Sequence, residues 1–399
     1  MPIGKNLKFK LRDKKDHFVI TLYKDFREKS NINQDSIILL NINGNEIIRI
    51  PNKDFHVSIP KRFAKTNLKN TQIKITRIWN KEKAKNRKFK LFSKGKINIK
   101  SLIPTKTIFG HEIFILDDGP YFYTWYSVGG GAEHIKIKNE MELEKLAELI
   151  GFYFGDGSTS HNIRSFRLNN CESSVLNYCL KILREIGIPK DKMKVQVIYS
   201  TPKSNLNNSI KRRCINYWST ILRFNKEQII SVNRSFGKTE SLKYGSARVL
   251  LDNSLLVEVL LHGVLKNFLD FIKEPKRKED MKILKGFLRG LAAAEGSVTL
   301  TKLKSLAKIS MSFDPHSDEL NLYKKILGNI DLKYGGTKGN ELYIYGIRNF
   351  KIMEDLDLFK MHEQRREKFI LGYKNHRFSK NAISKASPLK IAPTKSEIL

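Results

Sequence analysis

Two acidic residues stand directly before a glycine, each at the end of a predicted apolar helix. Asp156 closes the segment LIGFYFGDG (149–157), and Glu295 closes LRGLAAAEG (288–296). The C-terminus of a helix carries about half a negative charge, so a carboxylate there is disfavoured by roughly 0.3–1 kcal/mol. Two such carboxylates in matching segments indicate a function, because perturbed acids collect at functional sites.

Small residues follow the same pattern in both segments. Gly151 and Gly155 lie four residues apart in the first segment, as Gly290 and Ala294 do in the second. Small residues at this spacing let two helix backbones approach closely. We therefore expect these four residues to form a helix–helix interface that brings Asp156 and Glu295 together at one end. The glycines that follow the two acids are expected to end the helices in the left-handed conformation.

Two carboxylates at paired helix ends repel each other, and a bound divalent cation would remove that repulsion. Oxygen ligands favour Mg²⁺, with Mn²⁺ as the alternative. Two such ions about 3.5–4 Å apart could polarise a phosphodiester and activate water for its cleavage. From the residues alone, the competing interpretation is a pair of helix caps with exposed acids.

The elements that would position these acids form two similar series. Residues 141–275 and 276–372 each predict helix, two strands, helix, two strands, helix, which indicates an internal duplication. In the first series RCINYWSTIL is assigned to a strand. Residues 1–140 predict a β-rich domain of unknown role, with a hairpin at Asn43-Gly44, and residues 373–399 a flexible basic tail. The expected fold class is α+β.

The charge of the chain indicates a polyanionic partner. There are 74 Lys and Arg against 40 Asp and Glu, a net charge of +34. A lysine-rich proteome is the alternative, but that bias normally brings matching glutamate. Neutralising phosphates releases counterions and gives affinity for nucleic acid. No run approaches the roughly 20 apolar residues that span a bilayer, and no signal peptide is evident, so a cytoplasmic, nucleoid-associated protein is expected.

With these motifs, residues 141–371 resemble the LAGLIDADG homing endonucleases in their single-chain, two-repeat form. The resemblance implies that the final acids, Asp156 and Glu295, bind the catalytic metals and that each repeat lays a β-sheet along the DNA major groove. It also implies a basic residue near each acid. MHEQRREKFIL (361–371) is similar to a stretch of the family and places Arg365 in this role, and Lys266 is the nearest counterpart in the first repeat.

The leading hypothesis is a monomeric, Mg²⁺-dependent DNA endonuclease, free-standing or intron-encoded and not an intein, that cuts both strands at a long site. Five basic residues of the predicted strands would contact double-stranded DNA, with a solvated strand face as the alternative: Arg164, Arg167, Lys302, Lys304 and Lys308. Two other functions stay open. One is a non-catalytic DNA-binding regulator of the same fold, and the other is a maturase that assists splicing of intron RNA.

Overall fold

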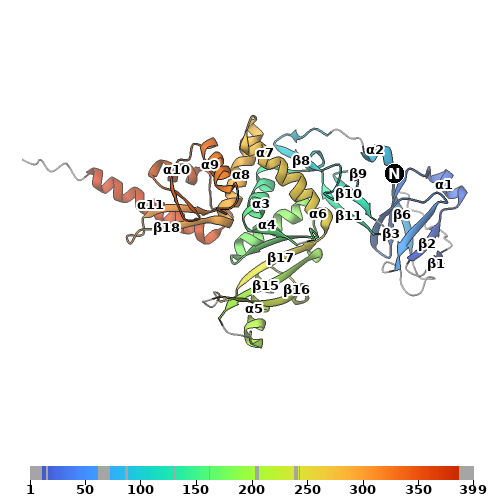
Figure 1. Cartoon of the computed structure of the whole chain (residues 1–399), viewed down its shortest axis with the longest axis horizontal. Coiled ribbons are helices and arrows are strands. Elements are labelled where there is room, and N and C mark those ends of the chain that lie inside the picture. The colour runs from blue at the N-terminus through green and yellow to red at the C-terminus, as the bar shows by residue number, and fades with distance from the viewer. Residues whose placement is uncertain are drawn as a thin grey trace, which may run out of the picture.

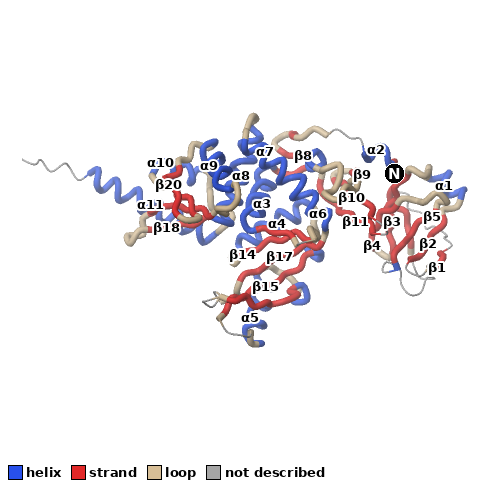
Figure 2. Tube along the Cα trace, in the orientation of Figure 1, coloured by secondary structure: helices blue, strands red, loops and turns tan. Residues whose placement is uncertain are grey.

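The computed structural model describes residues 11–14, 17–61, 72–85, 89–128, 131–160, 162–202, 206–237, 241 and 243–385. Helices and strands are mixed along the chain, so the fold is α+β (Figure 2). Two helices, α3 (Leu143–Asp156) and α8 (Lys278–Glu295), pack together near the middle of the molecule. The N-terminal strands lie at one end of the molecule and α11 (Glu363–Lys385) at the other (Figure 1).

The N-terminal segment forms two antiparallel sheets around a small apolar core that includes Ile20, Leu40 and Val57. The strand orders are β1-β2-β5 and β4-β3-β6. The predicted hairpin is confirmed, because β3 and β4 are joined at Asn43 and Gly44, whose φ angles of 50° and 88° suit a type I′ turn. The elements are β1 (Leu11–Asp13), β2 (His17–Thr21), α1 (Lys24–Ser30), β3 (Ser36–Ile42), β4 (Asn45–Arg49), β5 (His56–Pro60), β6 (Ile73–Asn80) and α2 (Lys81–Lys85).

Two further sheets, β11-β10-β9 and β12-β8-β7, connect this segment to the central helices. Ile97, Phe122 and Ile137 are buried in the same hydrophobic core as α3 and α8. The core therefore crosses residue 140, the domain boundary expected from the sequence. The elements are β7 (Phe92–Ser93), β8 (Lys96–Asn98), η3 (Ile99–Leu102), β9 (Phe114–Asp118), β10 (Tyr121–Val128), β11 (Gly131–Lys138) and β12 (Glu140–Glu142).

From α3 onward, the first unit builds a five-stranded sheet in the order β13-β14-β17-β15-β16. Its last helical stretch is continuous and contains a π-helical segment, η6, between α6 and α7. The elements after α3 are β13 (Gly157–Thr159), β14 (Ser165–Asn170), α4 (Ser173–Ile186), η4 (Lys190–Lys192), β15 (Met193–Thr201), α5 (Asn208–Ile221), η5 (Lys226–Gln228), β16 (Ile229–Phe236), β17 (Ser246–Asp252), α6 (Ser254–Val257), η6 (Glu258–Leu265) and α7 (Lys266–Lys273).

The strand assigned to RCINYWSTIL is wrong, because these residues lie in helix α5 and the turn that follows it. Cys214, Trp218 and Leu222 are buried at a spacing of four residues, which is one face of a helix. Asn207 caps the helix by accepting a hydrogen bond from the backbone N–H of Ile210 at 2.8 Å. The segment from α5 to β16 is an insertion between strands β15 and β17 of the sheet.

The second unit builds a four-stranded sheet in the order β18-β19-β21-β20. These strands are connected in the same order as β13, β14, β15 and β17, but a two-residue turn at Gly339-Asn340 joins β20 to β21. The elements after α8 are β18 (Gly296–Leu300), β19 (Leu306–Ser312), α9 (Glu319–Asn329), β20 (Tyr334–Lys338), β21 (Glu341–Ile344), α10 (Ile347–Asp355) and α11 (Glu363–Lys385).

Helix α11 also corrects the expected tail, because it continues from Glu363 to Lys385. Phe369 and Tyr373 are buried one helical turn apart, and Gly372 between them packs against the side chain of Leu300. The first part of the expected tail is therefore ordered by packing on the second unit. Residues 386–399 lie outside the described part of the chain.

The glycines after the two acids are not left-handed, contrary to expectation. Gly157 and Gly296 have φ angles of −88° and −74° and lead directly into strands β13 and β18. A β-carbon on Gly157 would lie 2.2 Å from the carbonyl oxygen of Tyr153, and one on Gly296 would lie 2.4 Å from that of Ala292. Glycine is required here for space and not for φ. Among the described residues, no helix is long and apolar enough to cross a membrane.

Candidate active site

Helices α3 and α8 cross with their backbones in contact. A β-carbon on Gly151 would lie 2.1 Å from the carbonyl oxygen of Phe287, and one on Gly290 would lie 2.1 Å from that of Glu148. A β-carbon on Gly155 would lie 2.6 Å from the β-carbon of Ala294. All four residues expected at the interface therefore lie at the crossing, and at the three glycines there is no room for a β-carbon.

Asp156 and Glu295 lie at the same end of this helix pair. The Oε1 atom of Glu295 would be 3.3 Å from a β-carbon on Gly155, the residue before Asp156. Asn170, at the end of strand β14, donates a hydrogen bond from its Nδ2 to Oδ2 of Asp156 at 2.7 Å. This amide holds one oxygen of the Asp156 carboxylate. Asn170 was not predicted from the sequence.

Both carboxyl groups are harder to ionise than free acids. Burial raises the pKa of Asp156, while the hydrogen bond from Asn170 and the positive charge of Arg365 oppose the change. Burial and the negative charges of Asp156 and Glu319 together raise the pKa of Glu295 to about 7, against the effect of Arg365. The site thus concentrates negative charge in a poorly solvated place, where a cation would be stabilised.

Arg365, at the start of α11, lies beside both acids. Its Nη1 atom donates to the carbonyl oxygens of Ala292, Ala293 and Ala294 at 3.0, 2.7 and 3.3 Å. These carbonyls belong to the last turn of α8, where the helix dipole is negative and a cation is favourable. Arg365 therefore caps the helix that presents Glu295 and supplies positive charge next to both carboxylates.

Lys266 is not part of this arrangement. It is exposed on α7, which packs on α8, and within the described residues no hydrogen bond or ion pair joins it to Asp156 or Glu295. Lys266 begins α7, and the end of α7 leads through residues 274–277 into the N-terminal end of α8, whereas the acids lie at the C-terminal ends of α3 and α8.

A buried ion-pair network holds the two helices together two turns before the acids. Glu148 of α3 is fully buried and accepts hydrogen bonds from Nε of Arg289 at 2.7 Å and from Nζ of Lys360 at 3.2 Å. Tyr178 donates to the same carboxylate, and Arg289 also pairs with Glu144. The sequence analysis missed this network. Its signal in the sequence was a second charged residue at each motif segment: Glu148 directly before LIGFYFGDG and Arg289 within LRGLAAAEG.

The carboxylates fit a hard cation that keeps part of its water shell. The described residues contain no group of three or more His, Cys, Asp or Glu placed to hold a metal ion. Mg²⁺ is usually bound by one or two carboxylates, with water and substrate phosphates as its other ligands. A depression beside Glu295, lined also by Ser312, Asp314 and Glu319, leaves room for such ligands. The donor set is therefore suited to Mg²⁺ and is unsuited to an all-protein cage.

The uncovered face of the first sheet carries a polar row. Asn169, Arg248, Gln196 and Ser231 are paired across strands β14, β17, β15 and β16. Three of them have a buried polar atom without a hydrogen-bond partner: Oδ1 of Asn169, Nε of Arg248 and Oγ of Ser231. Buried polar atoms are normally paired, so a row of unpaired ones indicates a surface that hydrogen-bonds to a ligand. The burial of Arg248 and the charge of Arg167 lower the pKa of Arg248.

Of the five basic residues expected to contact DNA, two lie on strands. Arg167 lies on β14, on the same face as Asn169, and Lys308 lies on β19 with its Nζ atom 3.7 Å from the ring centre of Tyr343. Arg164 is exposed in the connection between β13 and β14. Lys302 and Lys304 are exposed in the connection between β18 and β19. In each of the two sheets, basic side chains therefore lie on the second strand and in the connection that leads to it.

Comparison with known proteins gave similarities among solved structures alone. No family model matches the chain, and no curated protein is significantly similar. The N-terminal LAGLIDADG domain of DUF199/WhiA is 15% identical, covers 54% of this chain and 82% of its own, and has a TM-score of 0.30. Full-length DUF199/WhiA from Thermatoga maritima is 14% identical, covers 61% of this chain and 68% of its own, and has a TM-score of 0.33. I-DmoI in complex with DNA and Ca is 14% identical, covers 54% of this chain and 89% of its own, and has a TM-score of 0.30. Values this low assign neither a family nor an activity to the chain.

Proposed function

We propose that the protein is a metal-dependent endonuclease that cuts double-stranded DNA, with Asp156 and Glu295 as its metal-binding residues. The observation that carries the proposal is the meeting of these two carboxylates at the paired ends of α3 and α8, with the pKa of both raised. A structural pair of caps would gain nothing from burying two like charges together, whereas a cation site requires it.

In this proposal each residue of the site has a defined task. Asp156 and Glu295 bind Mg²⁺, and Asn170 holds the Asp156 carboxylate in one orientation. The bound cation would supply an activated water and charge stabilisation of the phosphodiester. Arg365 adds positive charge where the cleaved phosphate gains negative charge, and it cannot act as a general base because it stays protonated. The close packing at Gly151 and Gly290 fixes the separation of the two carboxylates.

The two sheets would bind the DNA on either side of this site. The net charge of +34 favours a polyanionic partner. Part of this positive charge lies on the strands, at Arg167, Arg248 and Lys308. The unpaired polar atoms of Asn169, Arg248 and Ser231 suit hydrogen bonding to base edges, which present donors and acceptors in the major groove.

Cleavage of a plasmid library with randomised target sequences, in Mg²⁺, tests this proposal. Wild type and Glu354→Gln, which removes an exposed carboxylate of α10, are expected to yield specific double-strand cuts. Asp156→Asn and Glu295→Gln are expected to abolish cleavage while keeping the melting temperature and the affinity for DNA. Cutting that persists in either acid variant would overturn the assignment of the site.

The second candidate is a DNA-binding regulator without catalysis. The observation in its favour is Arg365, whose positive charge opposes the rise in the pKa of both acids and so partly compensates them. DNA binding that is independent of Mg²⁺, unchanged in Asp156→Asn and Glu295→Gln and never followed by cleavage would establish this candidate in place of the nuclease.

A further inference from the structure

The segment of residues 206–237, here called the insertion arm, has no counterpart in the second unit. It contains α5, η5 and the edge strand β16, whereas β20 and β21 are joined by a two-residue turn. In Figure 1 the arm projects away from the central helices, beyond strand β15. The two units therefore differ in the outer part of their sheets.

The arm is strongly basic, and its cations have no acidic partners. It contains six basic residues and one acid: Lys211, Arg212, Arg213, Arg223, Lys226 and Arg234, and Glu227. In the described part of the chain no carboxylate forms an ion pair with any of these cations. By contrast, two exposed arginines of the second unit, Arg348 and Arg366, are paired with Asp331 and Asp357. Unpaired cations are free to bind an external anion.

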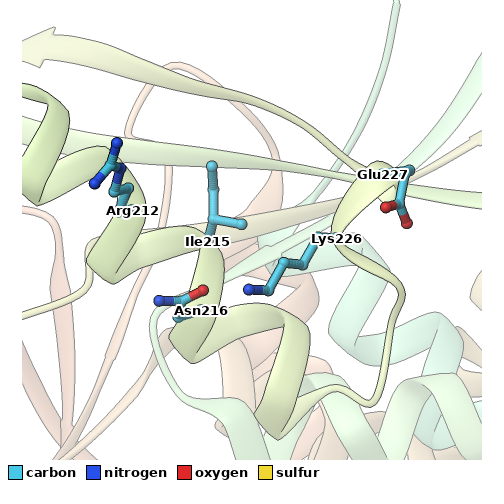
Figure 3. Close-up of a pocket in the computed structure, with 5 residues that line it drawn as sticks. All are labelled: Arg212, Ile215, Asn216, Lys226 and Glu227. Atoms are coloured by element: carbon cyan, nitrogen blue, oxygen red, sulfur yellow. The ribbon is translucent and has the colours of Figure 1, made fainter.

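Two of these cations, Arg212 and Lys226, line a shallow depression at the outer edge of the sheet. Arg212, Ile215 and Asn216 of α5 line one side, and Lys226 and Glu227 of η5 line the other (Figure 3). The local field is positive, because Arg184 and Arg223 help burial to lower the pKa of neighbouring Lys190. A guanidinium, an ammonium and an amide around one depression match the oxygens of a phosphate group.

The arm also lengthens the polar row of the first sheet. β16 is the edge strand, and its Ser231 continues the row beyond Gln196 of β15. Helix η5 ends at Gln228 and β16 begins at Ile229, so Ser231 and the depression at Lys226 belong to one short stretch of the chain.

We propose that the insertion arm is a second nucleic-acid contact, which binds the sugar-phosphate backbone of duplex DNA beyond the segment held by the two sheets. The first unit then covers a longer stretch of DNA than the second, and the bound site is asymmetric in length. The inference rests on the proposed DNA binding but not on cleavage. The partner is duplex DNA because Ser231 of the arm extends the polar row of the sheet that is proposed to bind DNA.

The test compares two triple variants that remove equal charge. Lys211, Arg212 and Lys226 are each changed to Gln in the arm variant. The control changes Lys276, Lys278 and Lys285 to Gln, which are exposed around the start of α8, at the far end from the acids. Binding to a fluorescein-labelled 40-base-pair duplex of random sequence is measured by anisotropy between 50 and 200 mM KCl without Mg²⁺.

The arm variant is expected to lower the slope of log K against log salt by about 2–3, since each phosphate contact contributes roughly 0.9. Its Kd should rise roughly tenfold or more at the highest salt. The control variant should match wild type in both. Equal losses of affinity in the two variants would mean that binding depends on charge spread over the whole surface, and this would overturn the inference. An arm variant that binds as wild type would overturn it too.

Two further outcomes separate this inference from the proposed function. Wild type that does not bind the duplex overturns both. Wild type that binds the duplex, with an arm variant that loses affinity for an RNA hairpin competitor alone, overturns the arm's assignment to DNA and leaves the proposed function standing. A benzoylphenylalanine at Asn216 should cross-link to the duplex if the depression holds its backbone.

Discussion

The backbone of Gly290 in α8 lies so close to α3 that a β-carbon on this residue would be 2.1 Å from the carbonyl oxygen of Glu148. No rotamer change can relieve this contact, because both partners are backbone. Any side chain at this position must push the two helices apart. The separation of Asp156 and Glu295 depends on the same crossing.

Gly290→Ala should therefore destabilise the protein by about 3 kcal/mol or more, in the range of severe packing defects. Chemical denaturation followed by circular dichroism measures the change. Gly328→Ala on α9 is the matched control, because nothing lies within 4 Å of a β-carbon there. This control should be neutral or stabilise by about 0.5–1 kcal/mol. Equal effects of the two variants would contradict the close crossing.

The buried carboxylate of Glu148 should be strongly coupled to Arg289. Glu148→Ala leaves the guanidinium of Arg289 without its buried partner and should cost about 3–5 kcal/mol. The double variant Glu148→Leu with Arg289→Met should recover much of that loss, because the two buried charges are removed together and their other partners, Lys360 and Glu144, are partly exposed. Denaturant unfolding of Glu148→Leu, Arg289→Met and the double variant forms the cycle. Strict additivity would show that the pair is not coupled.

Glu295 should make the metal-free protein less stable as pH rises. Its pKa of about 7 in the folded state lies above the ordinary 4.5, so the folded state holds more protons between these values and stability falls as pH increases through them. Glu295→Gln should remove this fall and stabilise the protein at pH 8 by about 1–2 kcal/mol, after a discount for partial exposure. Melting temperatures from pH 5 to 8 in the presence of a chelator check it.

Mg²⁺ should reverse that effect wherever Glu295 is intact. A cation that binds the folded protein and not the unfolded chain raises the melting temperature by mass action. The increase should be absent in Glu295→Gln and present in Glu354→Gln, whose carboxylate is exposed on α10. An equal increase in all three proteins would mean that the ion binds elsewhere.

His362 should cause a loss of stability in acid. It is buried, and its Nδ1 accepts the backbone N–H of Arg365 at 3.3 Å, which caps α11. Burial and the charge of Arg365 lower its pKa to about 4. The unfolded state therefore binds more protons between about pH 6.5 and 4, and stability falls as pH falls through this window. The loss should amount to roughly 1–3 kcal/mol.

His362→Asn should flatten this acid limb, since asparagine can still cap the helix and does not titrate. His134, whose pKa is also lowered to about 4, keeps part of the slope in this variant. His316→Asn, at an exposed position, should leave the curve as in wild type. Denaturation midpoints from pH 4 to 7 measure all three. An unchanged slope of stability against pH in His362→Asn would refute the assignment of a neutral His362 as the cap of α11.

Local signals in the sequence were sufficient for the helix pair and its small residues, because spacing along one helix determines which residues share a face. The same reasoning predicted the hairpin at Asn43-Gly44. It failed at α5, where Cys214, Trp218 and Leu222 have helical spacing but β-branched and aromatic neighbours favoured a strand. It also failed at Gly157 and Gly296, where contact with the preceding turn, and not φ, requires glycine.

The partners of the acids were harder to predict because they come from distant segments. Asn170 follows Asp156 by only one hairpin, yet an asparagine at a strand end is common and carries no distinctive pattern. Arg365 was placed by resemblance and lies beside both acids, whereas Lys266 was placed by position along the chain and lies elsewhere. The pairing of Glu148 with Arg289 depends on the helix crossing, which spacing alone does not orient.

The hydrophobic core that crosses residue 140 determines how the molecule can be divided. Ile97, Phe122 and Ile137 are buried with residues of α3 and α8, so the stretch from about residue 97 to α11 should open and close as one cooperative unit. The strands β1 to β6 carry a core of their own, and a further apolar cluster packs β3 and β4 against β9 and β10. A fragment intended to retain the two acids must therefore begin before β8, since a cut at residue 140 would expose apolar surface that belongs to the helix pair.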